Sequence, residues 1–72
     1  MKVQDRIAIR VNGETRQISA GLTIAAMLAE LGLDPRKVAV ERNLKIVPRS
    51  TLDEVPAEAG DVFEIVHFVG GG

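Results

Sequence analysis

The chain has 72 residues with a formal net charge of −1, and 46% of its residues are hydrophobic. This length allows one domain with a single small core, and the hydrophobic content argues against a disordered chain. The absence of cysteine excludes disulfides, thiolate metal sites and thiol catalysis, and a single histidine speaks against a zinc site.

No apolar stretch approaches the roughly 18 residues that span a bilayer. The opening residues 1–14 are charged and interrupted, unlike a signal peptide. We therefore expect a cytoplasmic protein without a membrane partner. The near-neutral charge and the two aromatic residues, both Phe, argue against nucleic-acid binding.

Charged residues are unevenly distributed. The middle of the chain holds a basic cluster of Arg36, Lys37, Arg42, Lys45 and Arg49. No Lys or Arg follows it, and the later acidic residues are Asp53, Glu54, Glu58, Asp61 and Glu64. Two interpretations stay open, because these clusters are either two solvated faces or include one that steers a charged partner.

The first element is a predicted hairpin. Residues 6–11, RIAIRV, alternate apolar and polar side chains, which is typical of a half-buried strand. Asn12-Gly13 favours a type I′ turn, and residues 14–19 return as the second strand with Ile18 facing inward.

After residue 19 the spacing of the apolar residues changes from the alternation of a strand to the period of a helix, which predicts a helix over residues 24–31. Its apolar face is formed by Ile24, Met27, Leu28 and Leu31. Thr23 is placed to cap the N-terminus, Gly32 suits the left-handed position after the helix, and Pro35 prevents its continuation.

Three further strands are expected. Residues 37–42 form the third and 45–48 the fourth, which Pro48 confines to an edge or to its own end. Residues 49–61 form a loop with a helical turn near 50–52, and residues 62–69 form the last strand.

The resulting order, β–β–α–β–β–β, predicts an α+β fold in which one helix packs on a mixed sheet. The architecture is a β-grasp if the first and last strands pair in parallel at the centre, which element order alone does not establish. We expect a single domain at residues 1–69 and a glycine tail at residues 70–72.

The last strand has two apolar faces. We assign Phe63 and Ile65 to the core, because burying Glu64 on the opposite face would be costly. That leaves an outward row of Val62, Glu64, Val66 and Phe68. The row is either ordinary surface or a docking patch for another protein. His67 points toward the core or lies at its rim, in a structural role.

The chain finishes on Gly70, Gly71 and Gly72. Three glycines are either a frayed end or an arm without Cβ atoms that enters a narrow channel of a partner. Such an arm could present its terminal carboxylate for adenylation and then for attack by sulfur. The chain has no Cys and no Ser–His pair arranged for this chemistry, so it would be a carrier and not the catalyst.

The sequence resembles the sulfur carrier proteins of thiamine biosynthesis, the ThiS family, over nearly its whole length. The resemblance rests on VNGE at 11–14, TIAAMLAELGL at 23–33, VAVERNLKIVPRS at 38–50 and AGDVFEIVHFVGGG at 59–72. The IVPR segment at 46–49 and the final GD…EIVHFVGGG are its most specific parts.

The resemblance implies a covalent role for Gly72, which would be adenylated and then converted to a thiocarboxylate, with Gly70 and Gly71 threading the arm. It implies no bound cofactor, and ATP and Mg²⁺ would be used by an adenylyltransferase of the ubiquitin-activating type. Further partners would be a cysteine desulfurase relay and thiazole synthase. Val62, Glu64, Val66, Phe68 and Arg49 are the expected partner-binding residues. A carrier that visits two enzymes is best served as a monomer.

Three alternatives share the fold. The small subunit of molybdopterin synthase uses the same terminal chemistry, but the shorter chain and the IVPR segment argue against it. A ubiquitin-like modifier would form isopeptide bonds to lysine. A non-covalent interaction module would not need the glycines at all.

Overall fold

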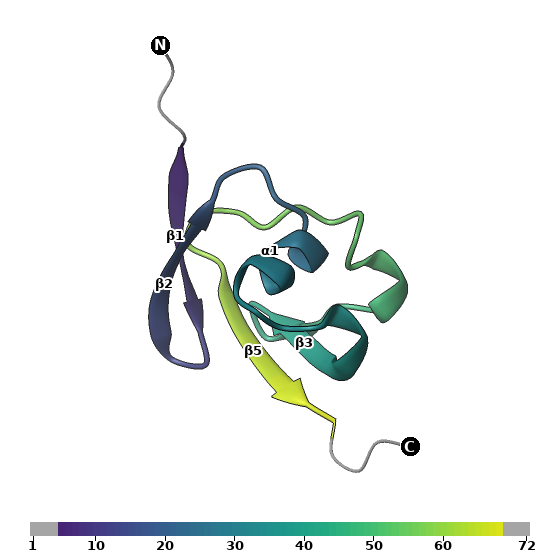
Figure 1. The fold of residues 1–72 in the computed structure, drawn as a ribbon. Helices are drawn as coiled ribbons and strands as arrows, with labels where there is room; N and C mark the ends of the chain where they lie inside the picture. The colour runs from purple at the N-terminus through teal and green to yellow at the C-terminus, as the bar shows by residue number, and fades with distance from the viewer. Residues whose placement is uncertain (1–4, 69–72) are drawn as a thin grey trace.

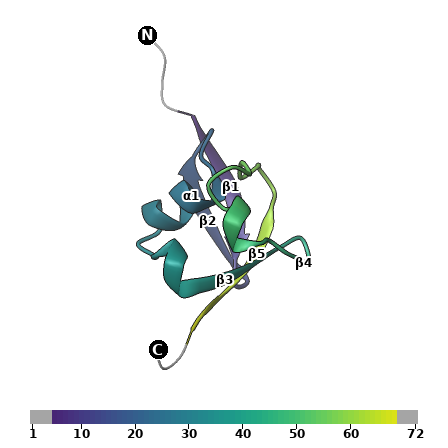
Figure 2. The same ribbon diagram turned by 90° about the vertical axis from the view of Figure 1, so that its right-hand side faces the viewer.

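The structure, a computed structural model, describes residues 5–68 and contains a five-stranded mixed sheet with one helix packed on it (Figures 1 and 2). The strands are β1 (Arg6–Val11), β2 (Glu14–Ser19), β3 (Val38–Arg42), β4 (Lys45–Ile46) and β5 (Val62–His67). The helix is α1 (Ile24–Glu30), and two short 3-10 helices are η1 (Pro35–Lys37) before β3 and η2 (Arg49–Thr51) after β4.

The sheet has the strand order β2-β1-β5-β3-β4. Its central pair consists of the first and last strands, which run parallel with Arg10 opposite Val62 and Val11 opposite Phe63. The other neighbouring strands are antiparallel. This is the pairing that the element order left undecided, and it confirms the α+β fold as a β-grasp.

The local sequence signals act as expected. Asn12 and Gly13 adopt φ values of 50° and 84° in the first hairpin. The Thr23 hydroxyl oxygen accepts a hydrogen bond from the Ala26 N–H at 3.1 Å and so caps α1. Gly32 ends this helical segment with φ 84°.

Several element boundaries differ from the predicted ones. α1 stops at Glu30 because Leu31 is already its C-cap, and β3 begins at Val38, one residue later than predicted. β4 is an edge strand that ends at Ile46, two residues before Pro48. η2 starts one residue earlier than the predicted turn, and η1 was not predicted.

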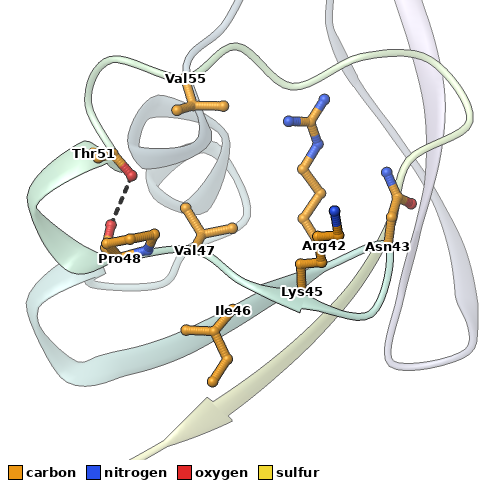
Figure 3. Close-up of a pocket in the computed structure, with 8 residues that line it drawn as sticks. All are labelled: Arg42, Asn43, Lys45, Ile46, Val47, Pro48, Thr51 and Val55. Atoms are coloured by element: carbon orange, nitrogen blue, oxygen red, sulfur yellow. Dashed lines mark hydrogen bonds between the residues drawn. The ribbon is translucent and has the colours of Figure 1, made fainter.

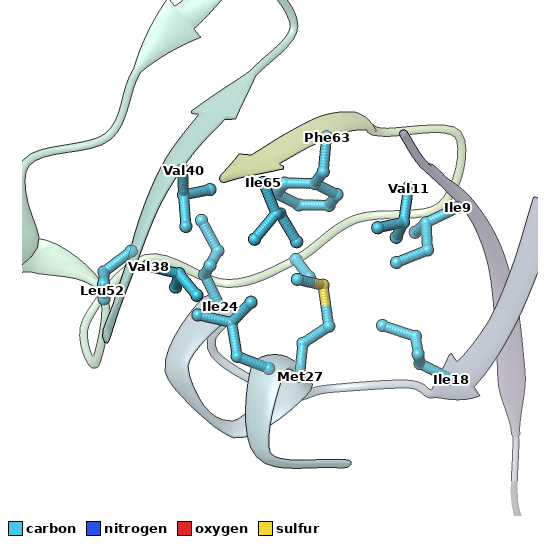
Figure 4. Close-up of a cluster of buried hydrophobic side chains, with 12 residues drawn as sticks. Ile9, Val11, Ile18, Ile24, Met27, Val38, Val40, Leu52, Phe63 and Ile65 are labelled. Atoms are coloured by element: carbon cyan, nitrogen blue, oxygen red, sulfur yellow. The ribbon is translucent and has the colours of Figure 1, made fainter. Parts of the chain in front are cut away.

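One core lies between α1 and the sheet. It is formed by Ile9, Val11, Ile18, Ile24, Met27, Leu28, Val38, Val40, Leu52, Ala57, Phe63 and Ile65. Figure 4 shows side chains of the helix facing those of the strands across this layer. Phe63 and Ile65 of β5 are both buried in it, as predicted, so the alternate residues of β5 face the other way.

Asn12 has a second role that the turn signal did not reveal. Its side-chain oxygen accepts a hydrogen bond from the Ile65 N–H at 2.7 Å, and its amide group donates to the Ile65 carbonyl at 3.0 Å. The Asn12 N–H also donates to the Phe63 carbonyl at 2.9 Å. The side chain therefore extends the β1–β5 pairing past the end of β1 and fixes the position of β5.

Replacing Asn12 by Gly is expected to lower the free energy of unfolding by about 1–2 kcal/mol, because glycine retains the positive φ but loses both side-chain hydrogen bonds. N12D retains an acceptor but turns a second oxygen toward the Ile65 carbonyl, so it should lose at least as much. Urea unfolding of the two variants measures this. An N12G variant as stable as the parent would contradict the assigned role.

Candidate functional site

The sheet face opposite α1 is exposed along β5. Val62, Glu64 and Val66 alternate with the buried residues of this strand and therefore share that face. The exposed fractions are 40% for Val62, 64% for Val66 and 53% for Phe68, which follows β5. The prediction of an outward apolar row around Glu64 is thus confirmed.

β3 and β4 extend this face with residues that sequence analysis did not single out. Ala39 lies opposite Val66, Glu41 lies opposite Glu64, and Ile46 lies opposite Glu41. Together with Val40 they line a shallow depression of about 380 Å³. Ile46 is 77% exposed, so the apolar surface continues from β5 to the sheet edge. We call residues Ala39, Glu41, Ile46, Val62, Glu64, Val66 and Phe68 the docking face.

Leu44 extends the exposed apolar surface beyond the docking face. It lies in the β3–β4 turn, is 88% exposed and has φ 72°, a conformation that bulky side chains avoid. A sequence signal for this exposed side chain was available, because Leu44 is an apolar residue at a turn position where glycine is preferred.

Two glutamates occupy opposite positions in the strand register in the middle of the docking face. Glu41 and Glu64 are direct partners across the antiparallel β3–β5 pair, where like charges repel. Within residues 5–68 no ion pair joins either of them to a basic side chain. A basic group on a binding partner would relieve this repulsion.

Arg49 and Phe68, two predicted partner-binding residues, meet at the far end of β5. The Arg49 guanidinium carbon lies 4.9 Å from the centroid of the Phe68 ring. The Arg49–Phe68 pair directly precedes residues 69–72 in the chain. The other predicted site residues, Gly70, Gly71 and Gly72, lie outside the described residues.

The interpretation of Asp61 as part of an acidic surface is wrong. Asp61 is 6% exposed, and its carboxylate accepts hydrogen bonds from Arg42 Nε at 2.9 Å, the Glu58 N–H at 2.9 Å and the Asn43 side chain at 3.1 Å. Burial raises the pKa of Asp61, but these hydrogen bonds outweigh it and hold the pKa below its usual value. Arg42, assigned to the basic cluster, is the partner of this acid, so the two clusters are not separate surfaces.

The remaining candidates contribute less to the site. His67 is exposed and pairs with Val38 at the end of β5, which confirms its place at the rim. A depression of about 480 Å³ lies between β4 and the segment that runs from η2 to Val55, and Figure 3 shows the side chains that line it. None of them is a predicted partner-binding residue.

Residues 5–68 contain no cluster of three or more His, Cys, Asp or Glu side chains that could hold a metal ion. No helix in this range is long and apolar enough to cross a bilayer.

The molecule is thus a β-grasp domain with an apolar, centrally acidic sheet face that leads into a glycine-rich end. The family model described as the ThiS family matches residues 9–72, and the chain belongs to this family. The sulfur carrier protein ThiS of Bacillus subtilis is 48% identical over 50 residues, which cover 69% of this chain and 76% of that protein.

Two further comparisons describe the relatives. The crystal structure of a thiamine biosynthesis protein, ThiS, from Geobacter metallireducens superposes with a TM-score of 0.76 at 28% identity, covering 92% of this chain and all of that one. A thiazole synthase of Paramagnetospirillum magneticum is 58% identical over 62 residues, or 86% of this chain. The chain spans only 19% of that enzyme's length.

Proposed function

We propose that this chain is a sulfur carrier of thiamine biosynthesis whose sulfur is held on the carboxylate of Gly72. The observation that carries this proposal is the ThiS family match, which extends through the three glycines. It favours this function over the small subunit of molybdopterin synthase, a protein modifier or a non-covalent module. The chemistry requires a free carboxylate on Gly72.

The chain supplies the reacting carboxylate and a partner supplies the catalysis. An adenylyltransferase of the ubiquitin-activating type would use ATP and Mg²⁺, so that a carboxylate oxygen attacks the α-phosphate and pyrophosphate leaves. A sulfur nucleophile then attacks the acyl carbon and AMP leaves. With hydrogen sulfide as the nucleophile, the product is the thiocarboxylate and no oxidant or reductant is needed. In the cell a cysteine desulfurase relay would deliver the sulfur as a persulfide, whose outer sulfur attacks the acyl carbon as AMP leaves. A thiol would then reduce the S–S bond, which gives the thiocarboxylate and a disulfide.

Thiazole synthase is the proposed acceptor. Support comes from the Paramagnetospirillum enzyme, in which a stretch that resembles this chain is part of a polypeptide named thiazole synthase. When two domains are fused in one polypeptide of a relative, separate proteins that correspond to these domains are good candidates for binding partners. We place the reaction in the cytoplasm and expect a monomeric carrier, because each molecule must visit two enzymes.

We further propose that Val62, Glu64, Val66 and Phe68 bind these partners, and that Arg49 belongs to this site through its contact with Phe68 rather than through a partner contact of its own. The exposed apolar area of the docking face, its paired glutamates and its continuity with the C-terminal residues support this role. A partner with a basic group at the centre of an apolar patch would complement the docking face.

The direct test is the intact mass of the chain after incubation with the adenylating enzyme, ATP, Mg²⁺ and sulfide. We expect a mass increase that corresponds to the exchange of one oxygen for sulfur, located in the peptide that contains Gly72. The mass of the untreated chain verifies that Gly72 is terminal and unblocked. No increase with an enzyme that labels another ThiS protein would contradict the proposal.

Replacing Glu64 by Gln is expected to raise the stability of the domain by a few tenths of a kcal/mol, because it removes the repulsion by Glu41. The same change should slow association with the adenylating enzyme and reduce its salt dependence. Thermal unfolding and association rates at two ionic strengths measure both effects.

Glu54→Gln is the matched control for this change, since Glu54 is exposed and lies outside the docking face. It should leave the association rate unchanged. A stabilised E64Q variant that associates as fast as the parent would show that the carboxylate pair is not used in docking.

A further inference from the structure

Two contacts tie Phe68, the residue after β5, to the two 3-10 helices, and a third ties these helices to each other. The Phe68 N–H donates to the Lys37 carbonyl of η1 at 3.0 Å. The Arg49 guanidinium of η2 lies over the Phe68 ring, and its Nη1 donates to the Arg36 carbonyl at 2.7 Å. In Figure 1 the end of β5 accordingly runs beside the turn that precedes β3.

The two 3-10 helices that contact Phe68 are each held in place by hydrogen bonds of their own. The Asp34 carboxylate accepts hydrogen bonds from the Arg36 N–H at 2.9 Å and from its side chain at 3.0 and 3.1 Å. On the other side, the Thr51 hydroxyl donates to the Pro48 carbonyl at 2.9 Å, the dashed line in Figure 3, and so fixes the turn from which Arg49 projects.

This arrangement gives the IVPR segment a physical meaning. Ile46 lies on the docking face, Val47 packs against the core, and Pro48 is the N-cap of η2. Arg49 then reaches back to η1 and to Phe68. These two contacts give Arg49 a structural role within the chain.

We propose that Arg49 is a positioning residue that acts through Phe68 and fixes the backbone at the residue from which the C-terminal segment 69–72 continues. The proposal rests on the sulfur-carrier function. Four residues follow Phe68, and a chain of four spans at most about 14 Å. Over so short an arm, a rotation at Phe68 moves the reacting carboxylate by several ångströms, and a misplacement of about 1 Å can cost roughly 100-fold in rate.

The test is the rate of ATP–pyrophosphate exchange, which reports reversible adenylation, as a function of carrier concentration. Arg49→Met retains the length of the side chain but removes its charge and its hydrogen bond. We expect kcat to fall roughly tenfold or more while KM changes less than about threefold. R49K, which retains a cation that can lie over the ring, should restore part of kcat.

Two controls separate positioning from other roles. K45M removes an exposed cation of β4 that lies opposite Arg42, at the other end of the β3–β5 pair from Phe68, and it should leave kcat unchanged. F68A removes the ring on which Arg49 acts, so the R49M/F68A double variant should be no slower than F68A alone. Amide hydrogen exchange at Phe68 should accelerate in R49M and stay unchanged in K45M.

The outcomes are distinct. A raised KM with an unchanged kcat in R49M would overturn the proposal, because Arg49 would then bind the partner directly. Unchanged kcat and KM would overturn it as well, since the contact with Phe68 would have no role in the reaction. If the parent chain supports no exchange, with an enzyme that is active on another ThiS protein, the sulfur-carrier proposal fails instead.

Discussion

Deletion of Gly72 is expected to lower the rate of thiocarboxylate formation roughly 100-fold or more. The shortened chain still ends in a glycine carboxylate, so the reacting group is retained. That group ends about 3.5 Å nearer the domain, however, and cannot come within the roughly 3 Å of the α-phosphate that attack requires. The intact-mass assay measures the loss directly.

Thermal stability should not change in this variant, because in the described residues the buried core ends at Ile65 and the last described backbone hydrogen bond is that of Phe68. A chain extended by one glycine is the matched control. It displaces the carboxylate by the same length in the other direction and should be equally slow. Labelling of the shortened chain at the parent rate would contradict the proposed use of the glycine arm.

The hairpin, the helix and the faces of β5 could be predicted because short-range patterns determine them. Asn12-Gly13 specifies its turn locally, Thr23 caps the helix three residues away, and alternation in β5 separates Phe63 from Glu64. The parallel β1–β5 pair could not be predicted in the same way, because nothing local indicates which strands become neighbours. Only the resemblance to a known family pointed to it.

The loop between η2 and β5 was predicted, but its hydrogen bonds to α1 could not be, for a related reason. It has little regular structure, but its carbonyl groups complete the N-terminus of α1. The Ile24 N–H donates to the Val55 carbonyl at 2.9 Å and the Ala25 N–H to the Leu52 carbonyl at 2.7 Å. These hydrogen bonds join backbone groups and depend on the path of the chain, not on side-chain type. No pattern of residues in the sequence therefore predicts them.

The candidate site residues of β5 were predicted from the sequence, whereas the neighbouring residues of β3 and β4 were not. Glu64 and Val66 belong to the strand whose alternation could be read, whereas Glu41 and Ile46 join them only through strand register. Asp61 was misassigned because it looks like its acidic neighbours in the sequence. Its partner Arg42 lies 19 residues away and only the folded sheet brings the two together.

Replacing Asp61 by Ala is expected to lower the free energy of unfolding by about 2–3 kcal/mol. The change leaves the Glu58 N–H, the Asn43 amide and the Arg42 guanidinium without their acceptor. The Arg42 side chain is only 26% exposed, so water replaces the lost contact incompletely. In a domain of this size the midpoint of thermal unfolding should fall by about 10 °C or more.

The pH dependence identifies the carboxylate as the cause. Because the folded-state pKa of Asp61 is lowered, its contribution is complete above the unfolded pKa of about 3.9 and is lost as the pH falls through the folded value. The difference in stability between the parent and D61N should therefore be constant from pH 7 to about pH 5 and shrink below about pH 4. Asp53→Asn, which alters an exposed acid, should show little difference at any pH. A D61N variant as stable as the parent at pH 7 would contradict the assignment.

Asp61 and Glu64 lie three residues apart but should respond to neutralisation with opposite signs. The buried acid is held by three donors, so losing its charge destabilises the domain. The exposed acid lies opposite another glutamate in the strand register, so losing its charge should stabilise the domain. Under the proposed function, a partner that supplies a cation would relieve the repulsion between Glu41 and Glu64. The comparison of D61N with E64Q therefore distinguishes a buried carboxylate that stabilises the fold from an exposed carboxylate that is available to a partner.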